Sequence, residues 1–441
     1  MSDPAAPPPL RVRGRLAPPR NTLIVYGLLQ HPLRSTIRDH LYSFRELGDG
    51  RHYYLNVAAR RVPRWVGKVP FDAVVFHHTL TGQRMEPRLL RWELRRARAL
   101  DGVGRYRIAM VQDECIYMDA IDEFIADYDI DEVFSVAPPS EWEKIYPQAV
   151  GRGVRFSQNL TGYLSRETVG RVDRIVAETP QRDIGIGYRA WGGLMSLGRQ
   201  GQLRTELERV FAAAAAERGI SADLSTDLAD TLHGDDWFRF LARCRYVIGA
   251  EGGATVLDRD GRFMEATQAY LAEHPDAGFD EVEAACFPGE DGKLQLHAIS
   301  PRHIEACATR TCQVLVEGDY SGVLRAGEHY IELKRDLANL DEVMGLIESD
   351  SERERITENA YRDIVASGRY GYSRLVEQVQ DSIESGLERK GAAEAVPRPD
   401  EGRLDALLRR ANREDKRSWA RVAVGVRVGR ALRRMRETVR G

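Results

Sequence analysis

The chain of 441 residues is 43% hydrophobic and 30% charged, which is ordinary for a soluble globular protein and leaves room for two domains. Its net charge of −3 is unevenly spread, because residues 401–441 hold 13 Lys and Arg against 5 Asp and Glu. The rest of the chain is therefore acidic, which argues against a general nucleic-acid-binding protein, whereas the tail could touch an anionic surface.

The cysteines and the apolar runs predict the compartment. Five cysteines are scattered without a paired metal-binding spacing or a disulfide framework, so we expect a reducing environment. No run of 18 apolar residues and no hydrophobic signal core is present. We therefore expect a cytoplasmic protein, with a peripheral position at the inner face of the membrane left open.

The first part of the chain predicts one α/β domain. Residues 1–20 contain six prolines and four arginines and are expected to be disordered. Short apolar runs then alternate with helical patterns, which favours a parallel, doubly wound sheet over residues 21–170. Strands are expected near 22–26, 73–76, 108–111, 132–136 and 154–156, and helices near 39–47, 88–100 and 121–128.

The same alternation recurs and predicts a second doubly wound domain over residues 171–370. Strands are expected at 183–187, 246–249, 314–316 and 329–333, and helices at 203–218, 232–244, 263–271 and 340–366. A last helix is expected at 371–388.

Residues 389–441 are expected to be a linker followed by a basic amphipathic tail, in which Trp419, valines and leucines interleave with arginines. The tail could pack on the body or on a partner, or lie on an anionic membrane surface. Contact with nucleic acid is disfavoured.

Three stretches of the second unit suggest a binding site. In SPRHIEA, Glu305 lies inside an otherwise apolar helical pattern, and a half-buried carboxylate needs donors. In YVIGAEGGATVLD, Gly252 and Gly253 follow a strand, where a turn could present backbone amides to an anion. In the glycine-rich segment that follows residue 183, Arg189 could pair with phosphates.

In their order and spacing, these stretches and the YSGVL and HYIELK segments resemble the donor half of GT-B glycosyltransferases, in particular bacterial group 1 and spore-maturation-type enzymes. The resemblance implies an α/β fold of two Rossmann-like domains facing across a cleft, with the helix at 371–388 returning to the first domain. It also implies a metal-independent transferase, of hexosyl or a related group. Such an enzyme moves a sugar from a nucleotide sugar to a glycan, lipid-linked or small-molecule acceptor, in surface polysaccharide or glycoconjugate synthesis.

The resemblance also assigns roles to residues. Glu305 would hold the ribose hydroxyls, while Arg189 and the amides of Gly252 and Gly253 would hold the diphosphate. Arg302, Ser321 and Gly322 would also lie on the donor side. Retaining members often carry a second glutamate eight positions earlier, where this chain has His297, so retention or inversion stays open.

The carboxyl ends of the strands in the first domain supply the candidates for the acceptor side. His78 or Asp113 could act on the acceptor hydroxyl, although each could equally cap a loop or helix. The further acceptor-side candidates are His31, Arg34, His77 and Glu114.

No metal and no cofactor are expected besides the nucleotide-diphosphate sugar as co-substrate. Asp127–Asp131 (DYDID) has the Asp-x-Asp spacing of a divalent-metal site, but it lies where strands begin, away from the expected cleft. Two alternatives stay open: a non-catalytic GT-B-like scaffold or sugar-nucleotide sensor, and a GT-B-fold sugar-nucleotide epimerase.

Overall fold

The computed structural model describes residues 20–391 and 400–440, with side chains described as far as residue 426. The segment expected to be disordered, residues 1–20, falls outside the described residues except for Arg20, and so does most of the predicted linker.

The first domain is built on a six-stranded parallel sheet of order β2-β1-β3-β4-β5-β6. Its strands are β1 (Asn21–Tyr26), β2 (Arg51–Asn56), β3 (Ala73–Phe76), β4 (Tyr106–Met110), β5 (Glu132–Ser135) and β6 (Arg155–Gln158). Its helices include α1 (Ser35–Leu47), α2 (His78–Thr81), α3 (Pro87–Ala97), α4 (Met118–Asp127), α5 (Trp142–Ile145) and α6 (Pro147–Gly151). β1 to β5 are buried over their whole length because helices cover both faces of the sheet, whereas the edge strand β6 is partly exposed.

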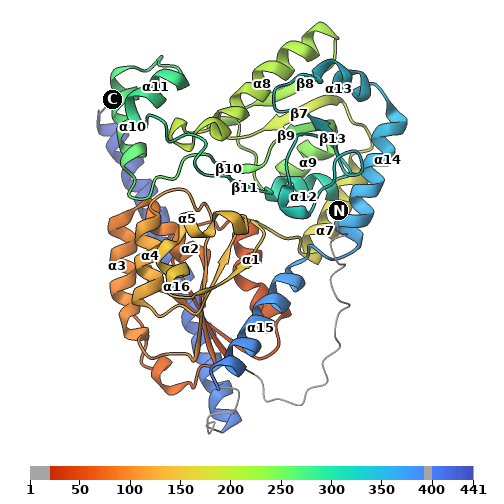
Figure 1. The fold of residues 1–441 in the computed structure, drawn as a ribbon. Coiled ribbons are helices and arrows are strands. Elements are labelled where there is room, and N and C mark those ends of the chain that lie inside the picture. The colour runs from red at the N-terminus through yellow and green to blue at the C-terminus, as the bar shows by residue number, and fades with distance from the viewer. Residues whose placement is uncertain (1–19, 392–399, 441) are drawn as a thin grey trace.

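The second domain is built on a five-stranded parallel sheet of order β13-β12-β9-β7-β8. Its strands are β7 (Ile184–Arg189), β8 (Ala222–Ser225), β9 (Cys244–Gly249), β12 (Cys312–Val316) and β13 (Ile331–Leu333). Its helices are α8 (Arg199–Glu217), α9 (Asp235–Arg243), α10 (Arg262–Glu273), α11 (Phe279–Cys286), α12 (Pro301–Ala308), α13 (Leu340–Ile347) and α14 (Asp350–Ala360). Two doubly wound α/β domains therefore stand one above the other, which confirms the expected GT-B fold class (Figure 1).

Two helices connect the domains. α7 (Arg166–Glu178) leads from the first sheet into the second, and α15 (Tyr372–Arg389) comes back from it. The apolar side of α15, including Tyr372, Val376 and Ile383, packs in one core with residues of the first sheet. α15 thus rests on the first domain, as Figure 1 also shows.

The carboxyl ends of the first sheet face the second domain. After β4, the amide of Tyr117 donates to the carbonyl of Asp258 at 2.8 Å. Next to it, the Arg259 guanidinium pairs with Asp119 at 2.6 Å. Because strand ends of parallel sheets are where α/β proteins bind ligands, this arrangement directs the chemistry toward the space between the domains.

The basic tail forms α16 (Glu401–Arg440), which packs along the first domain. Leu404 and Ala411 are fully buried, and the Asp415 carboxylate accepts hydrogen bonds from Tyr26 at 2.5 Å and Tyr42 at 3.1 Å. As far as residue 426, the tail is therefore a helix packed on the body. Within the described residues, no helix is both long and apolar enough to cross a membrane.

Candidate functional site

A pocket opens in the second domain where β7 and β9 end. Aromatic and aliphatic side chains of α9 form one wall, among them Trp237 and Phe240. Three arginines complete the lining: Arg189 at the end of β7, Arg204 in the second turn of α8 and Arg302 in the first turn of α12. The sequence indicated Arg189 and Arg302 but missed Arg204, although a charge early in a helix that follows a strand was a usable signal.

The three arginines differ in their partners. Arg189 pairs with Asp223 at 2.7 Å, and its guanidinium lies 4.5 Å from the ring centre of Phe240. Arg302 donates to the carbonyl of Arg189 at 2.8 Å and to Ser300 Oγ at 3.2 Å. Among the described residues, neither Arg204 nor Arg302 has a carboxylate within ion-pair distance. The pocket therefore holds two positive charges without an ion-pair partner of their own.

The electrostatics of Arg204 connect this pocket with the first domain. Burial and the neighbouring Arg302 guanidinium lower the pKa of Arg204, whereas Tyr188 and Asp113 act in the opposite direction. Asp113 belongs to the first domain and follows β4, so a carboxylate of one domain lies within electrostatic reach of a cation of the other. An anion bound beside Arg204 would offset both the burial and the repulsion from Arg302.

Two further polar atoms of residues that line this pocket have no hydrogen-bond partner in the described part of the chain: Gln313 Oε1, an acceptor, and Arg189 Nε, a donor. Both are buried, and buried polar groups in folded proteins are nearly always satisfied. A ligand with its own donors and acceptors would supply the missing partners.

Glu305 lies on α12, but it does not line the pocket itself. Its carboxylate accepts a hydrogen bond at 2.8 Å from Nε1 of Trp237, which does line the pocket. Burial raises the pKa of Glu305, while Trp237 and the nearby Arg302 and Arg171 counteract this effect. The structure therefore brings Glu305 behind the aromatic wall, in contact with the pocket through Trp237.

The two glycines after β9 do not form the expected open turn. They belong to β10 (Gly252–Ala254), which pairs antiparallel with β11 (Leu296–Ala298). Gly253 has a φ of 135°, and a Cβ there would lie 1.8 Å from the carbonyl oxygen of Leu296. A glycine is needed at this position for close strand pairing. A diphosphate contact by these amides stays a prediction.

The preceding residue, Glu251, was not singled out from the sequence. Its side chain is buried, and it accepts a hydrogen bond from the amide of Tyr320 at 2.7 Å. This contact holds the turn that contains Ser321 and Gly322. In that turn, Ser321 Oγ accepts from the amide of Ile299 at 3.2 Å, and the amide of Gly322 donates to the carbonyl of Asp319.

The acceptor-side candidates lie along the carboxyl edge of the first sheet, in different surroundings. Asp113 is exposed and has a left-handed backbone with a φ of 54°. Glu114 is fully buried, and its carboxylate accepts from the hydroxyls of Ser135 and Tyr146 and from two backbone amides. A buried carboxylate whose oxygens already accept hydrogen bonds from two hydroxyls and two amides typically stabilises a loop. His31 and Arg34 lie in the partly exposed loop between β1 and α1.

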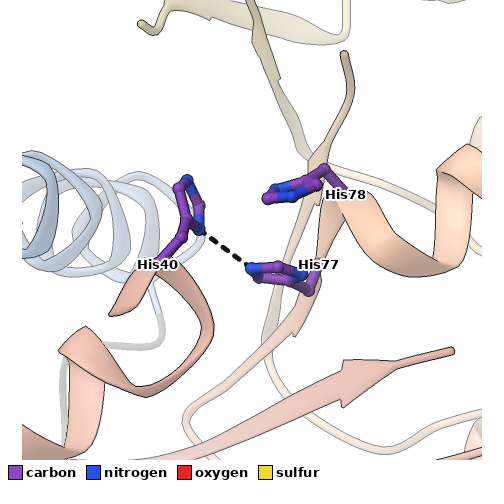
Figure 2. A group of neighbouring side chains, drawn as sticks. All are labelled: His40, His77 and His78. Carbon is purple, nitrogen blue, oxygen red and sulfur yellow. Dashed lines mark hydrogen bonds between the residues drawn. The ribbon is translucent and has the colours of Figure 1, made fainter. Parts of the chain in front are cut away.

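His77 and His78 join a third histidine, His40, which the sequence did not single out because it lies on α1, a separate element (Figure 2). His40 Nδ1 and His77 Nε2 are 2.9 Å apart, and the ring centres of His77 and His78 are 4.1 Å apart. Burial lowers the pKa of His78 to about 4 and moves the pKa values of His40 and His77 well below the usual range. All three rings are therefore neutral at neutral pH.

The Asp-x-Asp segment lies at the opposite edge of the first sheet, between α4 and β5. The Asp131 carboxylate pairs with Lys390 at 2.6 Å and accepts from the amide of Arg107 at 2.8 Å. These contacts tie Asp131 to the end of α15.

No protein-family model and no curated protein matches the sequence. Solved structures with a similar course of the chain include a glycosyltransferase from Rickettsia africae, with a TM-score of 0.45 and 9% identity over 84% of this chain and 99% of that one. Sucrose-phosphate synthase of Thermosynechococcus elongatus has a TM-score of 0.44 and 10% identity over 84% and 100% of the chains. HepE of Anabaena in complex with UDP has a TM-score of 0.42 and 11% identity over 83% and 100%. With every TM-score below 0.5, these likenesses decide nothing about chemistry.

Proposed function

We propose that this protein is a glycosyltransferase that binds a nucleotide-diphosphate sugar in the pocket of its second domain. The observation that supports this most is the pair Arg204 and Arg302, two cations beside the carboxyl ends of β7 and β9 that have no ion-pair partner among the described residues. Planar guanidinium groups are well suited to phosphate oxygens. The position at strand ends is the usual place for a nucleotide in a doubly wound sheet.

In this proposal the pocket holds the donor by its diphosphate. Arg204 and Arg302 neutralise the leaving diphosphate, and Arg189 supports Arg302 through its carbonyl oxygen. Trp237 takes the nucleoside side, and Glu305, which lies behind Trp237 and accepts from its Nε1, takes the ribose hydroxyls at the margin of the pocket. Because the arginines carry the charge, we propose that the donor diphosphate needs no divalent metal.

The acceptor sugar then enters from the first domain. Asp113 is an exposed carboxylate that contributes to the electrostatic surroundings of Arg204, and we propose that it takes the proton of the acceptor hydroxyl, with His78 as a neighbour on the same edge. The acceptor we propose is a glycan or lipid-linked sugar of a surface glycoconjugate.

The test is turnover of a panel of UDP, GDP and TDP sugars, with release of the nucleoside diphosphate as the readout. Wild type should release one of them, faster in the presence of an acceptor. Asp113→Asn should bind the same donor but lower the transfer rate by roughly 10²–10⁴, because asparagine tolerates the left-handed backbone and only the base is lost. An exposed acid of the same domain, Glu143→Gln, serves as the control.

Two results would overturn the proposal in different ways. Tight donor binding without turnover in the presence of any acceptor would make the protein a sensor or scaffold. Conversion of the donor sugar to its epimer without an acceptor would make it an epimerase.

A further inference from the structure

We propose that His40, His77 and His78 form a binding site for one transition-metal dication, Zn²⁺ in the first instance. The three side chains come from two separate parts of the first domain, and Figure 2 shows their rings turned toward one another. One nitrogen of each ring lies within 4.8 Å of those of the other two. This site is separate from the donor pocket and goes beyond the proposed function.

The backbone explains why two successive residues point the same way. Along a strand, neighbouring side chains alternate between the faces of the sheet. Here β3 ends at Phe76 and α2 begins at His78, so the chain turns between the two histidines. His77 caps that helix, because its Nδ1 accepts from the amide of Thr79 at 3.2 Å. Both imidazoles therefore reach His40, which lies on α1.

The donor set fits zinc. Imidazole is a preferred ligand of Zn²⁺, and sites with three histidines leave a fourth position for solvent or substrate. Zn–N bonds of about 2.0–2.1 Å separate ligand nitrogens by roughly 3.3 Å in a tetrahedral site. The His40–His77 pair, now 2.9 Å apart, would open slightly and His78 would close in.

The hydrogen bonds around the histidines point the same way. His40 is only 2% exposed, yet Nε2, its ring nitrogen that does not face His77, has no hydrogen-bond partner among the described residues, and neither has the buried Nδ1 of His78. Unpartnered buried nitrogens are rare and call for a ligand or solvent. When Nε2 of His77 binds a metal, Nδ1 carries the ring proton and donates to Thr79 Oγ1 at 3.0 Å instead of accepting from the Thr79 amide.

A second group of possible ligands among the described residues, Glu328, His329 and Asp363, is less suited. Arg325 pairs with both Glu328 and Asp363, and Arg362 also pairs with Asp363. Those carboxylates are already neutralised by cations that a metal would have to displace. This group therefore serves as the internal control.

The metal site bears on the choice between His78 and Asp113 as the group that acts on the acceptor hydroxyl. If His78 is a metal ligand, it cannot also take a proton from the acceptor, which leaves Asp113 as the base. The expectation of no metal was argued only from the diphosphate and the Asp127–Asp131 segment, and the histidine group lies apart from both.

The test is metal titration of the full chain after dialysis against a chelator, with Zn²⁺ measured by competition with a chromophoric chelator and Co²⁺ by visible absorption. Wild type should bind one equivalent and, with Co²⁺, show the absorption of a tetrahedral site. His40→Ala and His78→Ala should each lose more than about tenfold in affinity. Asp363→Asn and the exposed His233→Ala should bind as wild type does.

Circular dichroism checks that the variants fold. If His40→Ala does not fold, His78→Ala decides the test, because His78 is the least buried of the three histidines. Absence of a stoichiometric site in wild type would overturn the proposal. So would unchanged affinity in folded His78→Ala, or loss of the site in Asp363→Asn.

Discussion

Glu93 lies on α3 with its side chain fully buried, against the end of β1. Gly27 makes this contact possible, since a Cβ at that position would lie 2.3 Å from a carboxylate oxygen of Glu93. Neither carboxylate oxygen has a hydrogen-bond partner. Burial raises the pKa of Glu93 to about 8, with Arg96 acting in the opposite direction, so the group is largely protonated at neutral pH.

This burial predicts a pH-dependent stability. The pKa of Glu93 is higher in the folded chain than in the unfolded chain, where it is about 4.3. The contribution of Glu93 to the free energy of unfolding is therefore fully present below that pH. Between that pH and about 8 it falls as the pH rises, by roughly 1.4 kcal/mol per pH unit. Glu93→Gln should remove this loss, so that the stability of the variant relative to wild type rises between pH 5 and pH 8. Urea unfolding at both pH values measures this, with exposed Glu143→Gln as the control. Parallel stability curves for wild type and Glu93→Gln would contradict the assignment.

At the scale of elements, apolar runs were enough to predict most strands of both sheets. β2 was missed because Arg51, His52 and Asn56 interrupt its apolar pattern. The structure explains the burial of Arg51 by α16, where Asp405 accepts from Arg51 Nε at 2.8 Å. A partner some 350 residues away leaves no trace in a local pattern.

The sequence likewise indicated some residues of the candidate site and missed others. Arg189 and Arg302 were indicated because they stand in recognisable segments, and both line the pocket. Arg204 and His40 lie on helices that reach the strand ends only through the tertiary fold. The Gly252-Gly253 pair was read as a turn, but a long-range partner, β11, makes it a strand.

The tail helix supports a prediction of its own. Its side toward the body is buried, while Arg409, Arg413 and Arg417, spaced four residues apart, are exposed. Each basic residue near an anionic membrane surface contributes about 1 kcal/mol. If α16 brings the enzyme to a lipid-linked acceptor, replacing all three by Gln should weaken sedimentation with anionic liposomes by roughly a hundredfold.

The matched control for the tail is a variant with three exposed arginines of α3, Arg88, Arg91 and Arg95, replaced by Gln. It removes the same charge from a different face of the first domain. Equal sedimentation of the two variants, or none by wild type, would show that α16 serves only as a packing helix.

At the scale of the whole molecule, the carboxyl ends of the first sheet face the second domain, and the proposed function divides the chemistry between the two domains. The second domain supplies Arg204 and Arg302, which have no ion-pair partner among the described residues. The first domain supplies Asp113, whose carboxylate contributes to the electrostatic surroundings of Arg204. Under the proposal, donor recognition belongs to the second domain and acceptor activation to the first, and the arginine pocket is the part on which the proposed function rests.

The most direct test is calorimetric binding of UDP, GDP and TDP to the full chain in excess EDTA. One of them should bind to wild type, and Arg204→Gln and Arg302→Gln should each lose roughly 1.5–3 kcal/mol, because each removes hydrogen bonds to a charged phosphate. Arg239→Gln, on the exposed side of the neighbouring α9, should bind as wild type does. Binding that requires added Mn²⁺, or that is equally strong in all three variants, would contradict the assignment of the donor site to this pocket.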